Sequence, residues 1–108
     1  MEKTDINISQ LLLQIKAIKL DPANPFKWAS GILSPIYCDH RKTLSYPSVR
    51  KEIKHAFIDK VESLYPNANT IAGVATGAIA HGAMVADEMD KPFVYIRSSA
   101  KQHGMENL

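Results

Sequence analysis

The sequence has few of the features that direct a protein to a membrane, to nucleic acid or to secretion. Its 108 residues include one cysteine, Cys38, which excludes an internal disulfide. Thirteen Lys and Arg against eleven Asp and Glu leave a formal charge of +2, too little to indicate binding to nucleic acid or a membrane surface. No basic segment followed by an apolar stretch stands at the start, so we expect a reducing, cytoplasmic location without a secretory signal.

Long hydrophobic runs are also missing. Residues 71–86 form the most apolar window, but most of them are small, and Gly73, Gly77, Gly82 and His81 interrupt it. A membrane-spanning helix requires about 20 strongly apolar residues. We therefore expect no membrane span.

Metal ligands are scarce. Cys38, Asp39 and His40 are adjacent rather than spaced for zinc, and His55 and His81 are far away in the sequence. The sequence predicts no metal site formed by protein side chains. It offers no partner that would activate Cys38, so we expect this thiol to be buried and inert.

The first half of the chain predicts one helix and a pair of strands. Apolar residues at helical spacing indicate an amphipathic helix that is capped by Asp5 or Asn7 and ends near Leu20. Two runs rich in aromatic and branched residues, 26–29 and 36–39, are separated by turn residues and predict a hairpin-like pair. The apolar helix positions are Ile8, Leu11, Leu12, Ile15 and Ile18.

The second half predicts a helix followed by a βαβ unit. Ser45 can cap the helix, with Pro47 in its first turn. A strand at 71–75, a helix at 78–89 and a strand at 93–96 then follow, which requires a parallel, right-handed connection. The apolar stripe expected on the inner face of the first of these helices is Val49, Ile53, Phe57, Val61 and Leu64.

The predicted fold class is therefore α/β, with an N-terminal helix and hairpin followed by the first βαβ unit of a parallel sheet. We expect a single domain over residues 1–108. Its first part, residues 1–45, holds the helix and hairpin, and residues 46–108 hold the start of the sheet and a long loop.

The turn at residues 73–78 lies between a strand and a helix, where backbone N–H groups and the helix dipole favour an anion. Small residues there also allow the helix to pack closely on the strand. Arg97, Lys101 and His103 follow the next parallel strand and so reach the same sheet edge, where ligands of such sheets bind. Three such donors suit a polyanion such as pyrophosphate, although they also fit solvated charges on a loop.

Three blocks of the sequence resemble one family. Residues 26–39 resemble the hairpin of the orotate phosphoribosyltransferases, of the type I phosphoribosyltransferase family. Residues 71–82 resemble their pyrophosphate loop, and residues 97–104, with the pattern Arg-x-x-x-Lys-x-His-Gly, resemble their catalytic loop. The blocks occur in the family's order and spacing, and the similarity runs from about residue 20 to residue 108.

The resemblance implies a fold and a reaction. The fold would be the Rossmann-like sheet of type I phosphoribosyltransferases. The reaction would convert orotate and phosphoribosyl pyrophosphate to orotidine monophosphate and pyrophosphate in de novo pyrimidine synthesis. Mg²⁺ would be bound through phosphoribosyl pyrophosphate, and the protein would be a symmetric homodimer whose catalytic loop is shared between subunits.

The resemblance also assigns roles to residues of the two phosphate-binding blocks. Arg97, Lys101 and His103 match positions that contact phosphoribosyl pyrophosphate, and Lys101 and His103 would be catalytic. Thr76 and Gly77 match the pyrophosphate loop. The loop would exclude water and offset the charge that builds on the departing pyrophosphate.

The hairpin block places Tyr37 and Cys38 on the orotate side, although Tyr37 also fits a tyrosine in the core of a strand. Some family members have basic side chains where this sequence has Ala29, Leu33 or Gly77, and Ser98 replaces a further lysine.

One family signature is missing: a buried strand that ends in two acidic residues and a Thr/Gly-rich turn for the ribose 5-phosphate. Residues 83–88 resemble its first half, but Asp87 and Glu88 lie in a helical pattern and are expected to be solvated. The chain therefore resembles a truncated member, inactive by itself. Two alternatives are a non-catalytic sensor of phosphoribosyl pyrophosphate and an interaction fragment that pairs with full-length subunits.

Overall fold

The computed structural model of the chain describes residues 3–99, with side chains from residue 7 onward. The chain forms two compact units, Met1–Ala56 and Phe57–Leu108, and helix α2 (Pro47–Leu64) runs through the boundary between them. The single domain predicted from the sequence, with its subdivision between residues 45 and 46, stays a prediction.

The first unit begins with helix α1 (Lys3–Gln14), which ends earlier than the sequence predicted. Lys16 adopts a left-handed φ of 62°, a conformation that a helix cannot continue through. The N–H of Ala17 donates to the carbonyl of Leu12 at 2.9 Å, which closes the last turn. The prediction that this helix extends to Leu20 was therefore wrong.

The residues after this reversal form a strand. β1 (Ile18–Leu20) pairs antiparallel with β4 (Ile36–Cys38), with Ile18 opposite Cys38. The carbonyl of Ala17 also accepts from the N–H of Asp39 at 2.8 Å. The small core of the unit joins α1 to α2 and consists of Leu12, Ala17, Val49 and Ile53.

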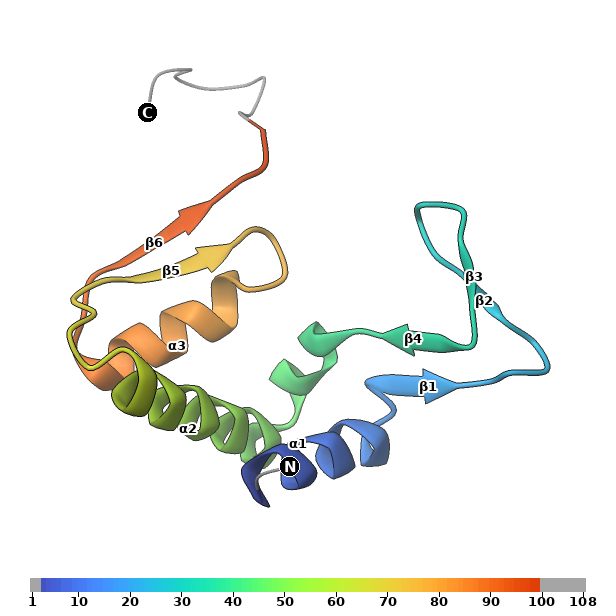
Figure 1. The fold of residues 1–108 in the computed structure, drawn as a ribbon, viewed down its shortest axis with the longest axis horizontal. Coiled ribbons are helices and arrows are strands. Elements are labelled where there is room, and N and C mark those ends of the chain that lie inside the picture. Colours follow the sequence, from blue (N-terminus) through green and yellow to red (C-terminus); the bar gives the residue numbers. More distant parts are fainter. Residues whose placement is uncertain (1–2, 100–108) are drawn as a thin grey trace. The chain divides into compact units, whose positions relative to one another are not determined.

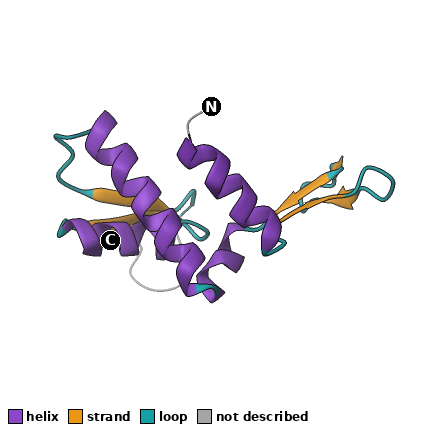
Figure 2. Ribbon diagram, turned by 90° about the horizontal axis from the view of Figure 1, so that it is seen from below, coloured by secondary structure: helices purple, strands orange, loops and turns teal. Residues whose placement is uncertain are grey.

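A second pair of strands extends the ribbon. β2 (Phe26–Lys27) pairs with β3 (Leu33–Ser34), not with the run at 36–39 that the sequence suggested. Gly31 closes the turn between them with a φ of 90°, which only glycine adopts without strain. Figure 2 shows these strands extending away from the end of α1.

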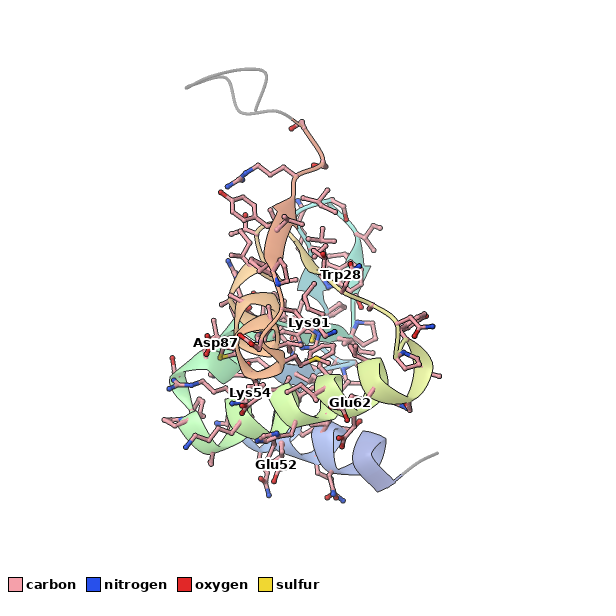
Figure 3. The ribbon with its side chains drawn as sticks, turned by 90° about the vertical axis from the view of Figure 1, so that its left-hand side faces the viewer. Trp28, Glu52, Lys54, Glu62, Asp87 and Lys91 are labelled. Atoms are coloured by element: carbon pink, nitrogen blue, oxygen red, sulfur yellow. The ribbon has the colours of Figure 1, made fainter. Side chains whose placement is uncertain are left out.

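A short 3₁₀ helix, η1 (His40–Ser45), which the sequence did not predict, precedes α2. Helix α2 itself is confirmed, with Pro47 as its first residue. Its stripe is only partly buried: Phe57 is 51% exposed and Leu64 is 62% exposed, so the prediction of an inner face along its whole length was wrong. Figure 3 labels three polar side chains along this helix, Glu52, Lys54 and Glu62.

The second unit contains the βαβ unit, as predicted. β5 (Ile71–Val74) and β6 (Phe93–Ile96) are parallel, with Ile71 opposite Phe93 and Val74 opposite Ile96. Helix α3 (Ile79–Met89) connects them and covers one face of the pair. Figure 1 shows both strands pointing the same way, so the turn after β5 and the residues after β6 leave the sheet at one edge. The predicted α/β fold class is confirmed.

The two faces of this sheet differ. On the covered face, Gly73 and Phe93 meet Gly82 of α3: a Cβ at Gly82 would lie 2.7 Å from Cε1 of Phe93. The close approach of strand and helix therefore depends on glycine. On the other face, four apolar side chains are exposed to solvent: Ala72, Val74, Val94 and Ile96.

Helix α3 ends at Asp90, which has a left-handed φ of 55°. Asp87 and Glu88, in its last turn, are exposed, as the sequence predicted. Lys91 follows, and its ammonium group donates to the carbonyl of Ala68 and ties the end of α3 to the segment before β5. Figure 3 labels Asp87 and Lys91 at this end of the unit. Among the described helices, none is both long enough and apolar enough to cross a membrane.

Candidate functional site at the carboxyl edge of the parallel strands

The turn between β5 and α3 presents backbone donors. The N–H of Ala78 donates to the carbonyl of Val74 at 3.0 Å, and that of Ile79 to the carbonyl of Thr76 at 3.2 Å. Within residues 3–99, no hydrogen bond uses the N–H of Thr76 or of Gly77. Both residues are exposed, and the peptide bond before Thr76 is cis. The turn therefore offers two N–H groups beside the positive end of the α3 dipole.

Arg97 is the residue after β6, and the end of β6 lies directly beside this turn. The N–H of Ala75 donates to the carbonyl of Ile96 at 2.8 Å, continuing the pairing of Val74 with Ile96. Neighbouring strands lie about 4.8 Å apart, so the turn and the residue after β6 start from adjacent positions. The structure thus places the start of the turn that carries Thr76 and Gly77 beside the strand end that Arg97 follows, as their assignment to one anion site requires.

The side chain of Arg97 lies over an aromatic ring. Its Cζ is 5.4 Å from the centre of the Tyr95 ring, within the range of a cation–π contact. Tyr95 shares the covered face of the sheet with Phe93, because alternate residues of a strand point to the same side. The guanidinium is therefore held on the face where α3 begins.

The glycines of the βαβ unit control how close α3 comes to the strand. A Cβ on Gly73 would lie 2.6 Å from the backbone oxygen of Ala78, at the start of α3. A Cβ on Gly77 would meet nothing within 4 Å. Gly73 is therefore needed for packing, whereas Gly77 has open space beside it.

Lys101 and His103, the predicted catalytic residues, lie outside the described residues. Their roles stay predictions. Ser98, which replaces a family lysine in the sequence, is exposed two residues after β6.

The hairpin residues assigned to orotate lie in β4 of the first unit. Tyr37 is 39% exposed, so the alternative of a core tyrosine was wrong. Its ring is tilted against that of Phe26, with centroids 5.8 Å apart. The indole N–H of Trp28 donates to the carbonyl of Ile36 at 2.9 Å and ties β2 to β4. Phe26 and Trp28 thus support the strand that carries Tyr37.

Cys38 is exposed, so the expectation that it is buried was wrong. Its Sγ lies 3.4 Å from Nε2 of His40. Although the thiol reaches solvent, partial burial raises its pKa, and the Asp39 carboxylate raises it further. The hydrogen bond from Arg41 lowers the pKa of Asp39, whose Oδ1 is 3.1 Å from the Arg41 Nε. The thiol is therefore held in its protonated, less reactive form.

The donors at the sheet edge suit an anion rather than a bare metal ion. Within the described residues, no group of three His, Cys, Asp or Glu side chains is arranged to hold a metal. Mg²⁺ is commonly bound by substrate phosphates with few protein ligands. A magnesium ion at this edge would therefore take its ligands from the diphosphate oxygens.

The architecture is that of the type I phosphoribosyltransferases. A solved orotate phosphoribosyltransferase from Aeropyrum pernix matches with a TM-score of 0.70 and 28% identity, over 91% of this chain and 54% of that chain. An adenine phosphoribosyltransferase from Saccharomyces cerevisiae shares the fold, with a TM-score of 0.66 and 21% identity over 93% of this chain and 56% of that one. No family model matches the chain.

Curated relatives of the chain include proteins named orotate phosphoribosyltransferase. The protein of that name from Bacteroides fragilis is 56% identical over all 108 residues, which are 51% of its own length. That from Porphyromonas gingivalis is 57% identical over 101 residues, which cover 94% of this chain and 48% of the relative. The chain spans about half the length of the curated relatives it matches, and it is a homologue of that part of an orotate phosphoribosyltransferase.

Sequence reasoning missed the supporting roles of Tyr95, Trp28 and Ala75. The alternation of β6 places Tyr95 and Arg97 on one side, a signal that the sequence contains. Neither the contact of Trp28 with Ile36 nor the bond from Ala75 has a local signal, because both depend on how strands pair.

Proposed function

We propose that this chain forms part of an orotate phosphoribosyltransferase, which transfers the phosphoribosyl group of phosphoribosyl pyrophosphate to orotate and releases pyrophosphate. The observation that carries this proposal is the identity of 56% over all 108 residues with a protein of that name. The shared edge of Thr76, Gly77 and Arg97 supports it, because its donors suit a diphosphate.

In this proposal each described residue has a separate task. The N–H groups of Thr76 and Gly77 bind oxygens of the diphosphate, and Arg97 binds two further oxygens through its planar fork. Charge on these oxygens increases as the bond to the ribose breaks, so donors fixed beforehand favour the transition state. Mg²⁺, carried by the diphosphate, would neutralise part of its charge. Lys101 and His103 would complete the loop that closes over it.

Tyr37 and Cys38 are proposed to face the orotate ring. The Phe26 ring and the indole of Trp28 hold the strand beneath them. We further propose a homodimer in which the loop after Arg97 reaches the neighbouring subunit's site, and a cytoplasmic location.

The direct test uses a polypeptide that contains these residues and has the length of the curated relatives. Incubated with orotate, phosphoribosyl pyrophosphate and MgCl₂, it should form orotidine monophosphate and pyrophosphate in equal amounts. Adenine in place of orotate should give no nucleotide, since the curated relatives with 56% and 57% identity are named orotate phosphoribosyltransferases. A folded polypeptide that forms no orotidine monophosphate would refute the proposal.

The uncovered sheet face favours a second candidate, an interaction fragment. Val74, Val94 and Ile96 are 64%, 51% and 54% exposed and neighbour one another in the register. Such a patch commonly marks a surface that binds further polypeptide. Size-exclusion chromatography of the chain with and without a full-length subunit tests this candidate: co-elution supports it, and separate elution contradicts it.

A further inference from the structure

The side chain of Arg97 extends from the end of β6 into solvent, where a free arginine samples many rotamers. Within residues 3–99, no carboxylate forms an ion pair with it. The contact that defines its position is with Tyr95, whose ring centre is 5.4 Å from Cζ of Arg97. Among residues 3–99, the partner that the structure gives this cation is therefore an aromatic ring and not an opposite charge.

A stacking partner leaves the arginine able to bind an anion. The five N–H donors of a guanidinium lie in its plane, whereas an aromatic ring attracts the cation through its face. A carboxylate partner would occupy those donors and offset the positive charge. Tyr95 can thus restrict the rotamers of Arg97 while both its charge and its donors stay available.

The place of Tyr95 in the sheet supports this role. Its neighbour in the register is Gly73, which has no side chain to cover the ring from β5. Tyr95 is 53% exposed, so packing in a core does not explain why an aromatic side chain stands at this position. It lies on the same face as Phe93, and this is the face that carries the first turn of α3.

We infer that Tyr95 is a positioning residue, which holds the guanidinium of Arg97 toward the N–H groups of the Thr76–Gly77 turn so that both bind one diphosphate. This inference rests on the proposed function, because it names the residue that prepares the proposed site. Tyr95 itself needs no contact with the ligand.

The first test is a double-mutant cycle on the full 108-residue chain, with inorganic pyrophosphate and MgCl₂ as the probe. Tyr95→Leu should weaken binding two- to fivefold, the range that corresponds to about 0.5–1 kcal/mol for an exposed cation–π contact. Tyr95→Phe keeps the ring and should bind like the wild type. In the background of Arg97→Ala, Tyr95→Leu should have no further effect.

A matched control is Val94→Leu, which changes the neighbouring side chain on the opposite face and should leave binding unchanged. The inference is overturned if Tyr95→Leu binds like the wild type, or if it weakens binding equally with and without Arg97. The latter result would indicate a general structural role. A loss with Tyr95→Phe equal to that with Tyr95→Leu would overturn it too, since the hydroxyl would then be the active group.

The second test needs no ligand. A ring over the guanidinium shifts the resonances of the Arg97 side-chain protons upfield in NMR spectra. This shift should be present in the wild type and in Tyr95→Phe, and absent in Tyr95→Leu. Its absence in the wild type overturns the inference whatever the binding result. A wild type that shows the shift but binds no pyrophosphate contradicts the proposed function and leaves the positioning of Arg97 supported.

Discussion

The backbone N–H of Ala75 donates to the carbonyl oxygen of Ile96 at 2.8 Å, so the first residue of the turn after β5 is bonded to the last residue of β6. Two segments that are distant in the chain thereby begin at one point of the sheet edge. The turn supplies backbone donors and Arg97 supplies a charge. The proposed diphosphate site depends on this junction.

The two glycines of the turn region should respond differently to substitution. Gly73→Ala places a Cβ 2.6 Å from the backbone oxygen of Ala78, which cannot move without shifting α3, so we expect a loss of about 1–3 kcal/mol in the free energy of unfolding. Gly77→Ala meets no atom within 4 Å and should change it by less than about 0.5 kcal/mol. Urea unfolding of both variants measures this; equal losses would contradict the packing described.

Gly82 and Phe93 should be coupled. A Cβ at Gly82 would lie 2.7 Å from Cε1 of Phe93, so Gly82→Ala should destabilise the chain by about 1–3 kcal/mol. Because the obstructing atom belongs to a side chain, Phe93→Leu removes it. The double variant should therefore be more stable than the sum of the two single changes predicts, in a double-mutant cycle of unfolding free energies. Strict additivity would show that the two residues do not meet.

Cys38 should react slowly with alkylating reagents near neutral pH. The thiolate is the reactive form, and both partial burial and the Asp39 carboxylate raise the pKa of the thiol. The rate of alkylation should therefore rise at higher pH than it does for an unperturbed cysteine. Asp39→Asn should lower the pH at the midpoint of this rise only part of the way toward that of an unperturbed cysteine, because burial is the larger cause of the raised pKa.

Glu52→Gln, which removes a carboxylate from α2 of the same unit, is the control for that measurement and should leave the midpoint unchanged. If Asp39→Asn moved the midpoint upward, the assignment of the Asp39 charge as a cause of the raised pKa of Cys38 would be wrong.

Gly77 also offers a place to add a charge. Some members of the family that this sequence resembles have a lysine here, and a side chain at this position would meet no atom within 4 Å at its Cβ. Gly77→Lys should strengthen pyrophosphate binding by about two- to fivefold, since an exposed charge pair contributes at most about 1 kcal/mol. The gain should decline with added salt.

Gly77→Gln has a long side chain without charge and serves as the comparison for that experiment. Isothermal titration calorimetry of both variants separates charge from contact. If Gly77→Lys and Gly77→Gln bound pyrophosphate with equal affinity, an anion at the turn would be contradicted.

The βαβ unit was predictable because its signals are local. A strand, a glycine-containing turn and a helix follow one another, and Phe93–Ile96 was predicted with the bounds that the structure shows. Helix α2 was predictable for the same reason, since Pro47 and a long periodic stretch identify it. Its exposed Phe57 shows that periodicity does not establish what covers a helix.

The first unit was harder to predict because its structure depends on distant pairing. Ile15 and Ile18 continue the helical spacing of the preceding residues, and nothing local indicates that Lys16 turns the chain. Ile18–Leu20 is a strand because Ile36–Cys38 lies beside it. The same limit applies to the site: the sequence indicated Arg97, whereas the bond from Ala75 to Ile96, which fixes the strand end beside the turn, depends on how the strands pair.

The most direct test is to titrate the isotope-labelled chain with pyrophosphate and MgCl₂ and follow its backbone amides by NMR. If the turn and Arg97 bind one diphosphate, the resonances of Thr76, Gly77 and Arg97 will shift together with one dissociation constant. Arg97→Ala should raise that dissociation constant about tenfold or more, as expected for the loss of a charge-assisted hydrogen bond. Arg41→Ala, which removes a guanidinium already paired with Asp39, should leave it unchanged. Unshifted amides at the turn and at Arg97 would contradict a shared diphosphate site.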